Sequence, residues 1–380
     1  MKVSVRIWLA AIILVHLMLG IGFWMHTPYG AAPDEKYHGV YVRHLADEWR
    51  LPVFSPENRD DYEAHQPPLY YALGVPFYLI GGDIGVRALS LVLGALSILA
   101  VFAAVRTLLP DRERTAIACA GSVALLPMHL ALSSSVANDI LAELIFGLAL
   151  LLMTRMLVSG PNTRASATLG LVLGLGLLSR TTCILLFPAS LLVYLILWRR
   201  GTLRASRAVT QSALMLGVSL AVGGWWLVRN AMLYGDPLAM SLFNEAFTHT
   251  ARPEFFVVER GLGWGGYFLL VGAWTFASFW GVFGHMNVFM PTWVYLTLAG
   301  FSIVTLIASI RPVAALRRDV LIVYAAVVLL VFAAFVRFNL TYFQAQGRYL
   351  YPAIIPIAVA FVLGVERLLG RGSGEANSRP

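Results

Sequence analysis

Two adjacent acidic residues, Asp34 and Glu35, are followed one helical turn later by His38. A carboxylate that is partly removed from water is a competent general base, and two acids beside a histidine can also bind a metal ion. The position equally suits a structural role, because Asp34 follows Pro33 and aspartate is a favoured helix N-cap. The residues themselves leave these alternatives open.

A second polar cluster consists of Glu63, His65 and Gln66, and it precedes the pair Pro67 and Pro68. In an extended segment, residues two apart face the same side, so we expect Glu63 and His65 to face one cavity. The prolines and the tyrosines after them are also typical of a loop that docks on a membrane. Both interpretations fit this segment.

Four arginines lie at or near the ends of apolar segments, namely Arg180, Arg229, Arg337 and Arg348. Any one of them can simply extend to lipid headgroups. Arg348 is the exception, because it follows Gly347, which permits close backbone approach, and because a guanidinium can hold a phosphate through two hydrogen bonds. We therefore rank Arg348 first and Arg229 second as anion-binding residues.

The composition requires a membrane around these residues. Hydrophobic residues make up 59% of the chain and charged residues 13%, about half the charge expected of a soluble domain. Many apolar segments approach or exceed the ~20 residues that a helix needs to cross a bilayer. The sequence predicts an all-α polytopic bundle of about ten spans, near 7–24, 85–107, 115–131, 140–157, 166–180, 182–198, 209–229, 291–310, 320–340 and 351–370.

The positive-inside rule sets the predicted topology. Two apolar stretches, 68–82 and 263–283, are doubtful as spans. If both lie at the membrane surface, all the short arginine-rich loops fall on one side, the cytoplasmic side. We therefore expect both termini to be cytoplasmic. Most acids then lie outside, in a long first loop at 26–82 with amphipathic interfacial helices and in a second outer segment at 230–290. We expect one transmembrane domain, 1–370, followed by a disordered cytoplasmic tail, 371–380.

The charge and motif content exclude several other functions. The net charge of +8 is spread between apolar spans, which argues against nucleic-acid binding. No nucleotide-binding motif is present in the sequence, so ATP-driven transport by this chain is not expected. Cys119 and Cys183 both lie in apolar spans, where packing accounts for them.

The order of the motifs resembles the GT-C superfamily of membrane glycosyltransferases, especially the branch that contains protein O-mannosyltransferases and lipid A aminoarabinose transferases. Nearly the whole chain takes part in the likeness. The segments that carry it are Pro33-Asp34-Glu35-x-x-His38, His65-Gln66-Pro67-Pro68-Leu69-Tyr70-Tyr71, Gly224-Trp225-Trp226-Leu227-Val228-Arg229-Asn230, Leu233-Tyr234-Gly235-Asp236-Pro237, Ser278-Phe279-Trp280-Gly281-Val282-Phe283-Gly284 and Gln346-Gly347-Arg348-Tyr349-Leu350-Tyr351-Pro352.

The resemblance implies an inverting glycosyltransferase in the bacterial cytoplasmic (inner) membrane, with its site facing the periplasm. Such an enzyme moves a sugar from a polyprenyl-phosphate donor to an envelope lipid, glycan or protein. By this resemblance Asp34 is the base with Glu35 beside it, and Arg348 and Arg229 bind the donor phosphate. Supporting or substrate-contacting roles fall to His38, Glu63, His65, Gln66, Asp139, His285, Gln346 and Tyr349.

The resemblance also implies that a divalent cation could be bound, and the candidate ligands are Glu63, His65 and Asp139. Aminoarabinose transferases have a Glu-Lys pair where this chain has His65-Gln66, so we assign the phosphate contact to arginine instead of lysine. Asp139 can alternatively be explained as a helix cap.

Two other functions are compatible with a membrane protein of this kind. A transporter or flippase of a lipid-linked sugar would place ionisable groups near the middle of its helices and often shows duplicated halves, and the sequence predicts neither. An O-antigen ligase or polymerase would also use outer arginines, but it transfers preassembled glycans.

Overall fold

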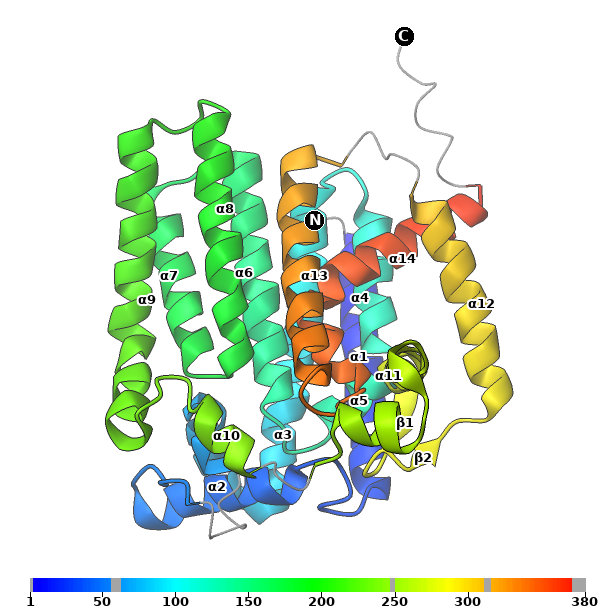
Figure 1. Ribbon diagram of the computed structural model, residues 1–380. Coiled ribbons are helices and arrows are strands. Elements are labelled where there is room, and N and C mark those ends of the chain that lie inside the picture. The colour runs from blue at the N-terminus through cyan, green and yellow to red at the C-terminus, as the bar shows by residue number, and fades with distance from the viewer. Residues whose placement is uncertain (1–2, 56–62, 247–249, 311–315, 371–380) are drawn as a thin grey trace.

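The computed structural model describes residues 3–55, 63–246, 250–310 and 316–370, and its elements are almost all helices (Figure 1). In chain order they are α1 (Val3–His26), α2 (Glu35–Glu48), α3 (Leu69–Leu108), α4 (Glu113–Ala124), α5 (Pro127–Ser133), α6 (Asp139–Ser159), α7 (Thr163–Leu177), the 3-10 helix η2 (Thr181–Leu185), α8 (Leu186–Arg199), α9 (Ala205–Tyr234), α10 (Met240–Ala246), the π-helical turn η3 (Phe255–Glu259), α11 (Gly263–Gly281), β1 (Val282–Phe283), β2 (Val288–Phe289), α12 (Thr292–Ser309), α13 (Arg318–Asn339), the 3-10 helix η4 (Gly347–Ala353) and α14 (Ile354–Leu368).

The chain is a multi-pass membrane protein, as the sequence predicts. Among the described helices, eight are long and apolar enough to cross a membrane, and the pair α4 and α5, bent by 66°, makes nine if it counts as one span. The one remaining predicted span, 166–180, corresponds to α7, an apolar helix of 15 residues. Each predicted span thus coincides with a helix or a bent pair, and the predicted all-α polytopic fold is confirmed.

Helix α3 folds back on itself at Gly82. This residue has φ 62° and ψ −157°, a conformation open essentially only to glycine. The first arm then runs beside the second, with the hydroxyls of Tyr70 and Ser90 2.6 Å apart. At about 1.5 Å per residue, the first arm is too short to cross a bilayer. It is therefore not a separate span, and the surface position expected for 68–82 stays a prediction.

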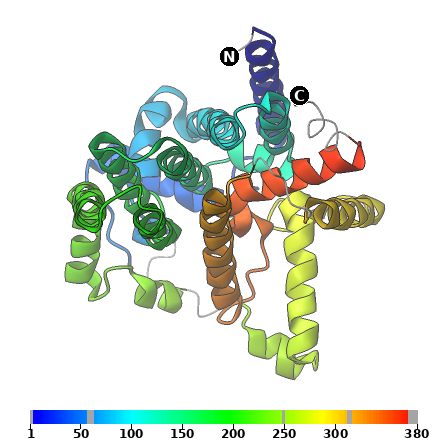
Figure 2. The ribbon, with the colours of Figure 1, turned by 90° about the horizontal axis from the view of Figure 1, so that it is seen from above.

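Helix α11, which covers the other doubtful stretch, lies across the bundle. Figure 1 shows α11 end-on among helices seen from the side, and Figure 2 shows it lengthwise beside α12, which is seen nearly end-on. It is not among the eight described helices that can span a membrane. The interpretation of 263–283 as a surface segment agrees with this arrangement.

Helix α2 covers one end of the bundle, the same end as α10 and the β1–β2 hairpin (Figure 1). It is amphipathic as predicted, since Tyr41 and Leu45 are buried whereas Lys36, Arg43 and Asp47 are exposed. The start of α1 and the end of α14 lie away from this end. The polar loops therefore gather on one side of the membrane domain.

A buried ion pair between Glu35 and Arg87 fixes α2 on the bundle. The guanidinium binds both carboxylate oxygens, at 2.7 and 2.8 Å, and donates to the carbonyls of Trp24, Thr27 and Pro28. Both side chains are at most 2% exposed. Buried charges are tolerated only when paired and hydrogen-bonded in this way. The pair thus connects α1, α2 and α3.

We expect Arg87→Ala to destabilise the protein strongly, because it leaves the Glu35 carboxylate buried without its partner. Breaking a buried pair costs about 3–5 kcal/mol. The matched control is Arg43→Ala, which removes a far more exposed pair with Asp83 and should cost at most about 1 kcal/mol. Thermal unfolding in detergent measures both variants, and equal shifts in Tm would contradict the role assigned to Arg87.

Candidate functional site

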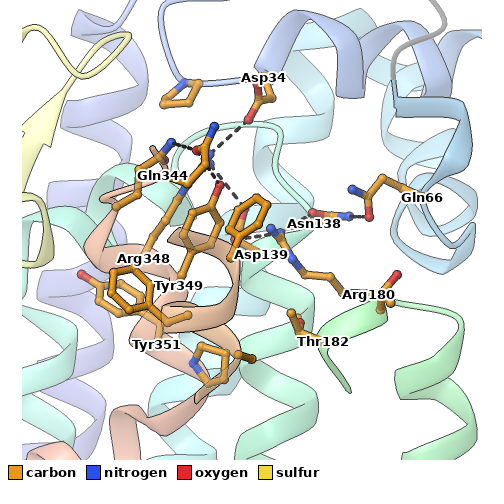
Figure 3. A pocket seen from close by; sticks show the side chains of 18 of the residues that line it. Asp34, Gln66, Asn138, Asp139, Arg180, Thr182, Gln344, Arg348, Tyr349 and Tyr351 are labelled. Atoms are coloured by element: carbon orange, nitrogen blue, oxygen red, sulfur yellow. Dashed lines mark hydrogen bonds and ion pairs between the residues drawn. The ribbon is translucent and has the colours of Figure 1, made fainter. Parts of the chain in front are cut away.

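A cavity of about 740 Å³ opens beside α2, where segments from distant parts of the chain meet. Its walls come from the loop before α2, the segment before α3, the start of α6, η2, α13 and η4. Figure 3 shows Asp34, Asp139, Arg180 and Arg348 pointing toward one another in it. One end of the cavity is therefore strongly charged.

Asp34 presents its carboxylate to the cavity instead of capping α2. Its side chain makes no cap hydrogen bond, although its backbone carbonyl accepts from the amides of Tyr37 and His38 at 3.0 Å. The residue has φ 62°, in the left-handed region that costs a non-glycine residue free energy and is often found at functional sites. Of the two roles considered for Asp34, the side-chain geometry favours the one in the site.

Arg348 reaches Asp34 across 314 positions of sequence. Its Nη2 donates to Asp34 Oδ2 at 3.1 Å and its Nη1 to Asp139 Oδ2 at 3.5 Å, and the side chain is 3% exposed. The preceding Gly347 packs directly on the backbone of Phe279, which a Cβ atom would approach to 2.2 Å. Glycine therefore allows the close approach that places Arg348 in the cavity.

Asp139 and Arg180 complete the charged group. Arg180 Nη1 lies 2.7 Å from Asp139 Oδ1 and also donates to Asn138 Oδ1 at 2.8 Å. The guanidinium groups of Arg180 and Arg348 both approach the ring of Tyr349, at 6.0 and 5.4 Å from its centroid. The positive charges of the two arginines are thus balanced by the negative charges of Asp34 and Asp139.

Buried polar groups line the wall next to Asp34. Glu63 is 4% exposed, and its Oε2 has no hydrogen-bond partner among the described residues. His38 Nδ1 lies 3.8 Å from this oxygen and 2.9 Å from the Tyr71 hydroxyl. Burial lowers the pKa of His38 to about 4, so its ring is neutral at physiological pH. Burial, together with the negative charge of Asp34, raises the pKa of Glu63 well above its usual range.

The remaining predicted residues also line the cavity, namely His65, Gln66, His285, Gln346 and Tyr349. The Gln66 amide lies 3.3 Å from His65 Nε2 and accepts from Asn138 at 3.3 Å. The expectation of an extended segment around Glu63 and His65 is wrong, because residues 63–65 form a 3-10 turn. They nevertheless face the same cavity, as expected.

Two predicted residues lie outside the cavity. Glu35 is fully buried against Arg87, so its position supports a structural role. Arg229 donates to the carbonyl of Pro52 at 2.7 Å and stacks over Trp226. The structure brings Arg180 to the site in its place, and Arg337 also lines the cavity. Local sequence gave the same pattern for all these arginines, a cation at the end of an apolar span.

A buried ionisable pair was not expected from the sequence. Glu143, which the predicted topology placed near the outer surface, is 3% exposed and its Oε1 lies 3.0 Å from Nε2 of His129. The ring of His16 lies 5.2 Å from that of His129. Glu143 lines the cavity one helical turn from Asp139, so the polar surface extends into the bundle.

The predicted cation ligands do not form a metal site by their geometry. Asp139 gives one carboxylate oxygen to Arg180 and the other to Arg348. In the part of the chain that the structure describes, no three His, Cys, Asp or Glu side chains are grouped to hold a metal ion. The cation predicted for Glu63, His65 and Asp139 stays a prediction.

Comparisons with known proteins agree with this architecture. Residues 65–225 match the sequence model of the family described as dolichyl-phosphate-mannose-protein mannosyltransferase. The crystal structure of ArnT from Cupriavidus metallidurans bound to undecaprenyl phosphate is similar, with TM-score 0.63 and 15% identity over 98% of this chain. The chain has the GT-C fold.

The oligosaccharyltransferase of Archaeoglobus fulgidus is a second structural relative. Its complex with Zn and sulfate has TM-score 0.57 and 14% identity over 95% of this chain. Its complex with an inhibitory peptide and a dolichol-phosphate has TM-score 0.55 and 15% identity over 100% of this chain. No curated protein matches the sequence significantly.

These comparisons confirm the predicted resemblance at the level of fold and family match, and both relatives are glycosyltransferases. This chain spans 62% of the length of ArnT and 50% of the archaeal chain. Its own activity, substrates and partners are therefore matters for proposal.

We expect Gly347→Ala to damage the site, because a Cβ atom would collide with the backbone of Phe279 and displace Arg348. Overpacking of this kind costs about 1–3 kcal/mol, which should appear as a lower Tm in detergent. Gly265→Ala in α11 is the control, since its Cβ would meet open space. A Gly347→Ala variant as stable as this control would show that the close contact is not needed.

Proposed function

We propose that this protein is an inverting glycosyltransferase that moves a sugar from a polyprenyl-phosphate donor to a hydroxyl group of a cell-envelope acceptor. The observation that supports this most is the placement of the Asp34 carboxylate in one cavity with the guanidiniums of Arg348 and Arg180. Such a reaction needs a base for the acceptor and cations for the leaving phosphate, and both are present.

The charge change at the donor suits two arginines. A sugar linked to a polyprenyl phosphate carries one negative charge, and the released monoester carries up to two at neutral pH. Arg348 and Arg180 approach the same region from η4 and from the residue before η2. Cations placed where negative charge develops stabilise the transition state more than the ground state. The bound undecaprenyl phosphate of ArnT and dolichol-phosphate of the archaeal relative support this choice of donor.

In the proposed step, the acceptor hydroxyl oxygen attacks the anomeric carbon of the sugar while Asp34 takes the hydroxyl proton. The bond from the anomeric carbon to the phosphate oxygen breaks, and its electron pair stays on the phosphate. A single displacement of this kind inverts the anomeric configuration. Since the Asp34 side chain is 37% exposed, the proton can then pass to water.

The apolar part of the cavity suits the lipid chain of the donor. Its lining includes Val331, Ala334 and Phe335 of α13 and Ile184 and Leu185 of η2. The donor would then lie with its prenyl chain against these side chains and its phosphate at the arginines. Burial of the chain contributes roughly 0.8 kcal/mol per CH₂ group.

We place the protein in the bacterial cytoplasmic membrane with this site facing the periplasm, in keeping with the short arginine-rich loops. The acceptor is then an envelope lipid, glycan or protein. One observation favours the alternative function of a flippase, namely the buried pair of Glu143 and His129. Ionisable groups inside a membrane bundle often mark transport pathways. Vesicle assays separate the two functions: translocation without covalent transfer indicates a flippase.

We expect Asp34→Asn to abolish transfer, with a loss of about 10²–10⁴-fold as is usual for a general base. The measurement is mass spectrometry of envelope lipids and glycans from cells that carry wild-type protein, the variant or none. Asp47→Asn on the exposed face of α2 is the matched control and should be active. Full activity in a correctly inserted Asp34→Asn variant would remove the assigned base.

We expect Arg180→Ala to reduce transfer about 10²–10³-fold, because a cation at the developing phosphate charge is lost. Arg199→Ala, an exposed arginine at the end of α8, should leave transfer unchanged. The same mass-spectrometric assay compares them. Equal activities would show that transfer does not need Arg180 and that its pairing with Asp139 is structural.

A further inference from the structure

Arg348 would bind a phosphate through the N–H groups of Nε and Nη2, and of these two only Nη2 makes a hydrogen bond among the described residues. Its Nη2 donates to Asp34 at 3.1 Å, whereas its Nε is buried and has no hydrogen-bond partner in the part of the chain that the structure describes. Nε and Nη2 form the side-on fork of a guanidinium, which holds two oxygens of a phosphate bidentately. Asp34 is therefore bound to one of the two nitrogens that a side-on phosphate would use.

The two partners of this bond differ in how firmly they are held. Arg348 is 3% exposed, binds Asp139 as well and follows the tightly packed Gly347. Asp34 is 37% exposed, has a left-handed backbone and uses its side chain for no cap. When an anion competes for the guanidinium, the Asp34 side chain is the one free to move.

We propose that the donor phosphate displaces Asp34 from Arg348, so that the base becomes free only in the donor-loaded protein. This inference rests on the proposed function. In the structure as it stands, Asp34 Oδ2 is engaged by Arg348 and competes with a phosphate for the same N–H group. After displacement, the phosphate is held by Nε and Nη2, and the released carboxylate faces the acceptor. Donor binding then precedes acceptor activation.

The consequence is unusual for a residue in a binding site: its removal should strengthen binding. The Asp34→Asn variant should bind undecaprenyl phosphate about three- to tenfold more tightly than wild type, because the competing carboxylate is gone. Asparagine tolerates the left-handed backbone at this position. Binding of undecaprenyl phosphate to purified full-length protein in detergent, followed by intrinsic tryptophan fluorescence, gives the affinity.

Asp83→Asn is the matched control. It removes a carboxylate that is paired with Arg43 outside the cavity, at the same end of the protein. Its affinity for undecaprenyl phosphate should equal that of wild type. An equal gain in both variants would assign the effect to overall negative charge and overturn the displacement.

A double-mutant cycle tests whether the effect passes through Arg348. With Arg348→Ala, undecaprenyl phosphate should bind at least tenfold more weakly than to wild type, and adding Asp34→Asn should then bring no gain. A gain that persists without Arg348 overturns the proposal, as does an Asp34→Asn variant that binds no more tightly than wild type.

The failure of this inference can be told apart from the failure of the proposed function. If Asp34→Asn loses transfer but gains no affinity, the base assignment holds and the displacement does not. If the variant gains affinity but keeps transfer, the displacement holds and Asp34 is not the base.

Discussion

The need to pair charges inside an apolar bundle determines the arrangement of this protein. A guanidinium or carboxylate in such surroundings is tolerated only beside an opposite charge with its hydrogen bonds satisfied. Asp34, Asp139, Arg180 and Arg348 come from four separate segments, and their ion pairs require these segments to meet at one point. The glycine contact at Gly347, the left-handed Asp34 and the turn before η2 are local features that achieve this.

Two buried arginines show how the same side chain serves structure or binding. Arg87 uses all three of its nitrogens, at the Glu35 carboxylate and three carbonyls, and it is 2% exposed. Arg348 is equally buried, but its two terminal nitrogens bind two different acids, and its Nε has no partner among residues 3–55, 63–246, 250–310 and 316–370. A saturated guanidinium has no N–H group left for a ligand, whereas Arg348 lines the cavity and keeps one N–H group, at Nε, for which the described residues provide no acceptor. We regard this difference as the main sign that Arg348 binds an anion.

The sequence predicted the spans well because apolar length is a local property, and it predicted most cavity residues because motifs mark them. It could not separate Asp34 from Glu35, since adjacent residues on a helix start differ in direction by about 100° and the pattern does not say which side holds Arg87. It ranked Arg229 above Arg180, although both arginines end an apolar span. Only tertiary packing distinguishes the two. Glu143 was assigned to the outer side by the predicted topology, whereas its pairing with His129 depends on tertiary packing. The predicted domain limits and the tail 371–380 are untested, and that tail lies outside the described residues.

An experimental structure of the protein with undecaprenyl phosphate, solved by cryo-electron microscopy in a nanodisc, tests the central claim most directly. We predict that the phosphate lies within hydrogen-bond distance of both Arg348 and Arg180, with the Asp34 carboxylate turned away from Arg348 toward the open side of the cavity. A phosphate bound elsewhere, with the bond between Asp34 and Arg348 intact, would contradict it.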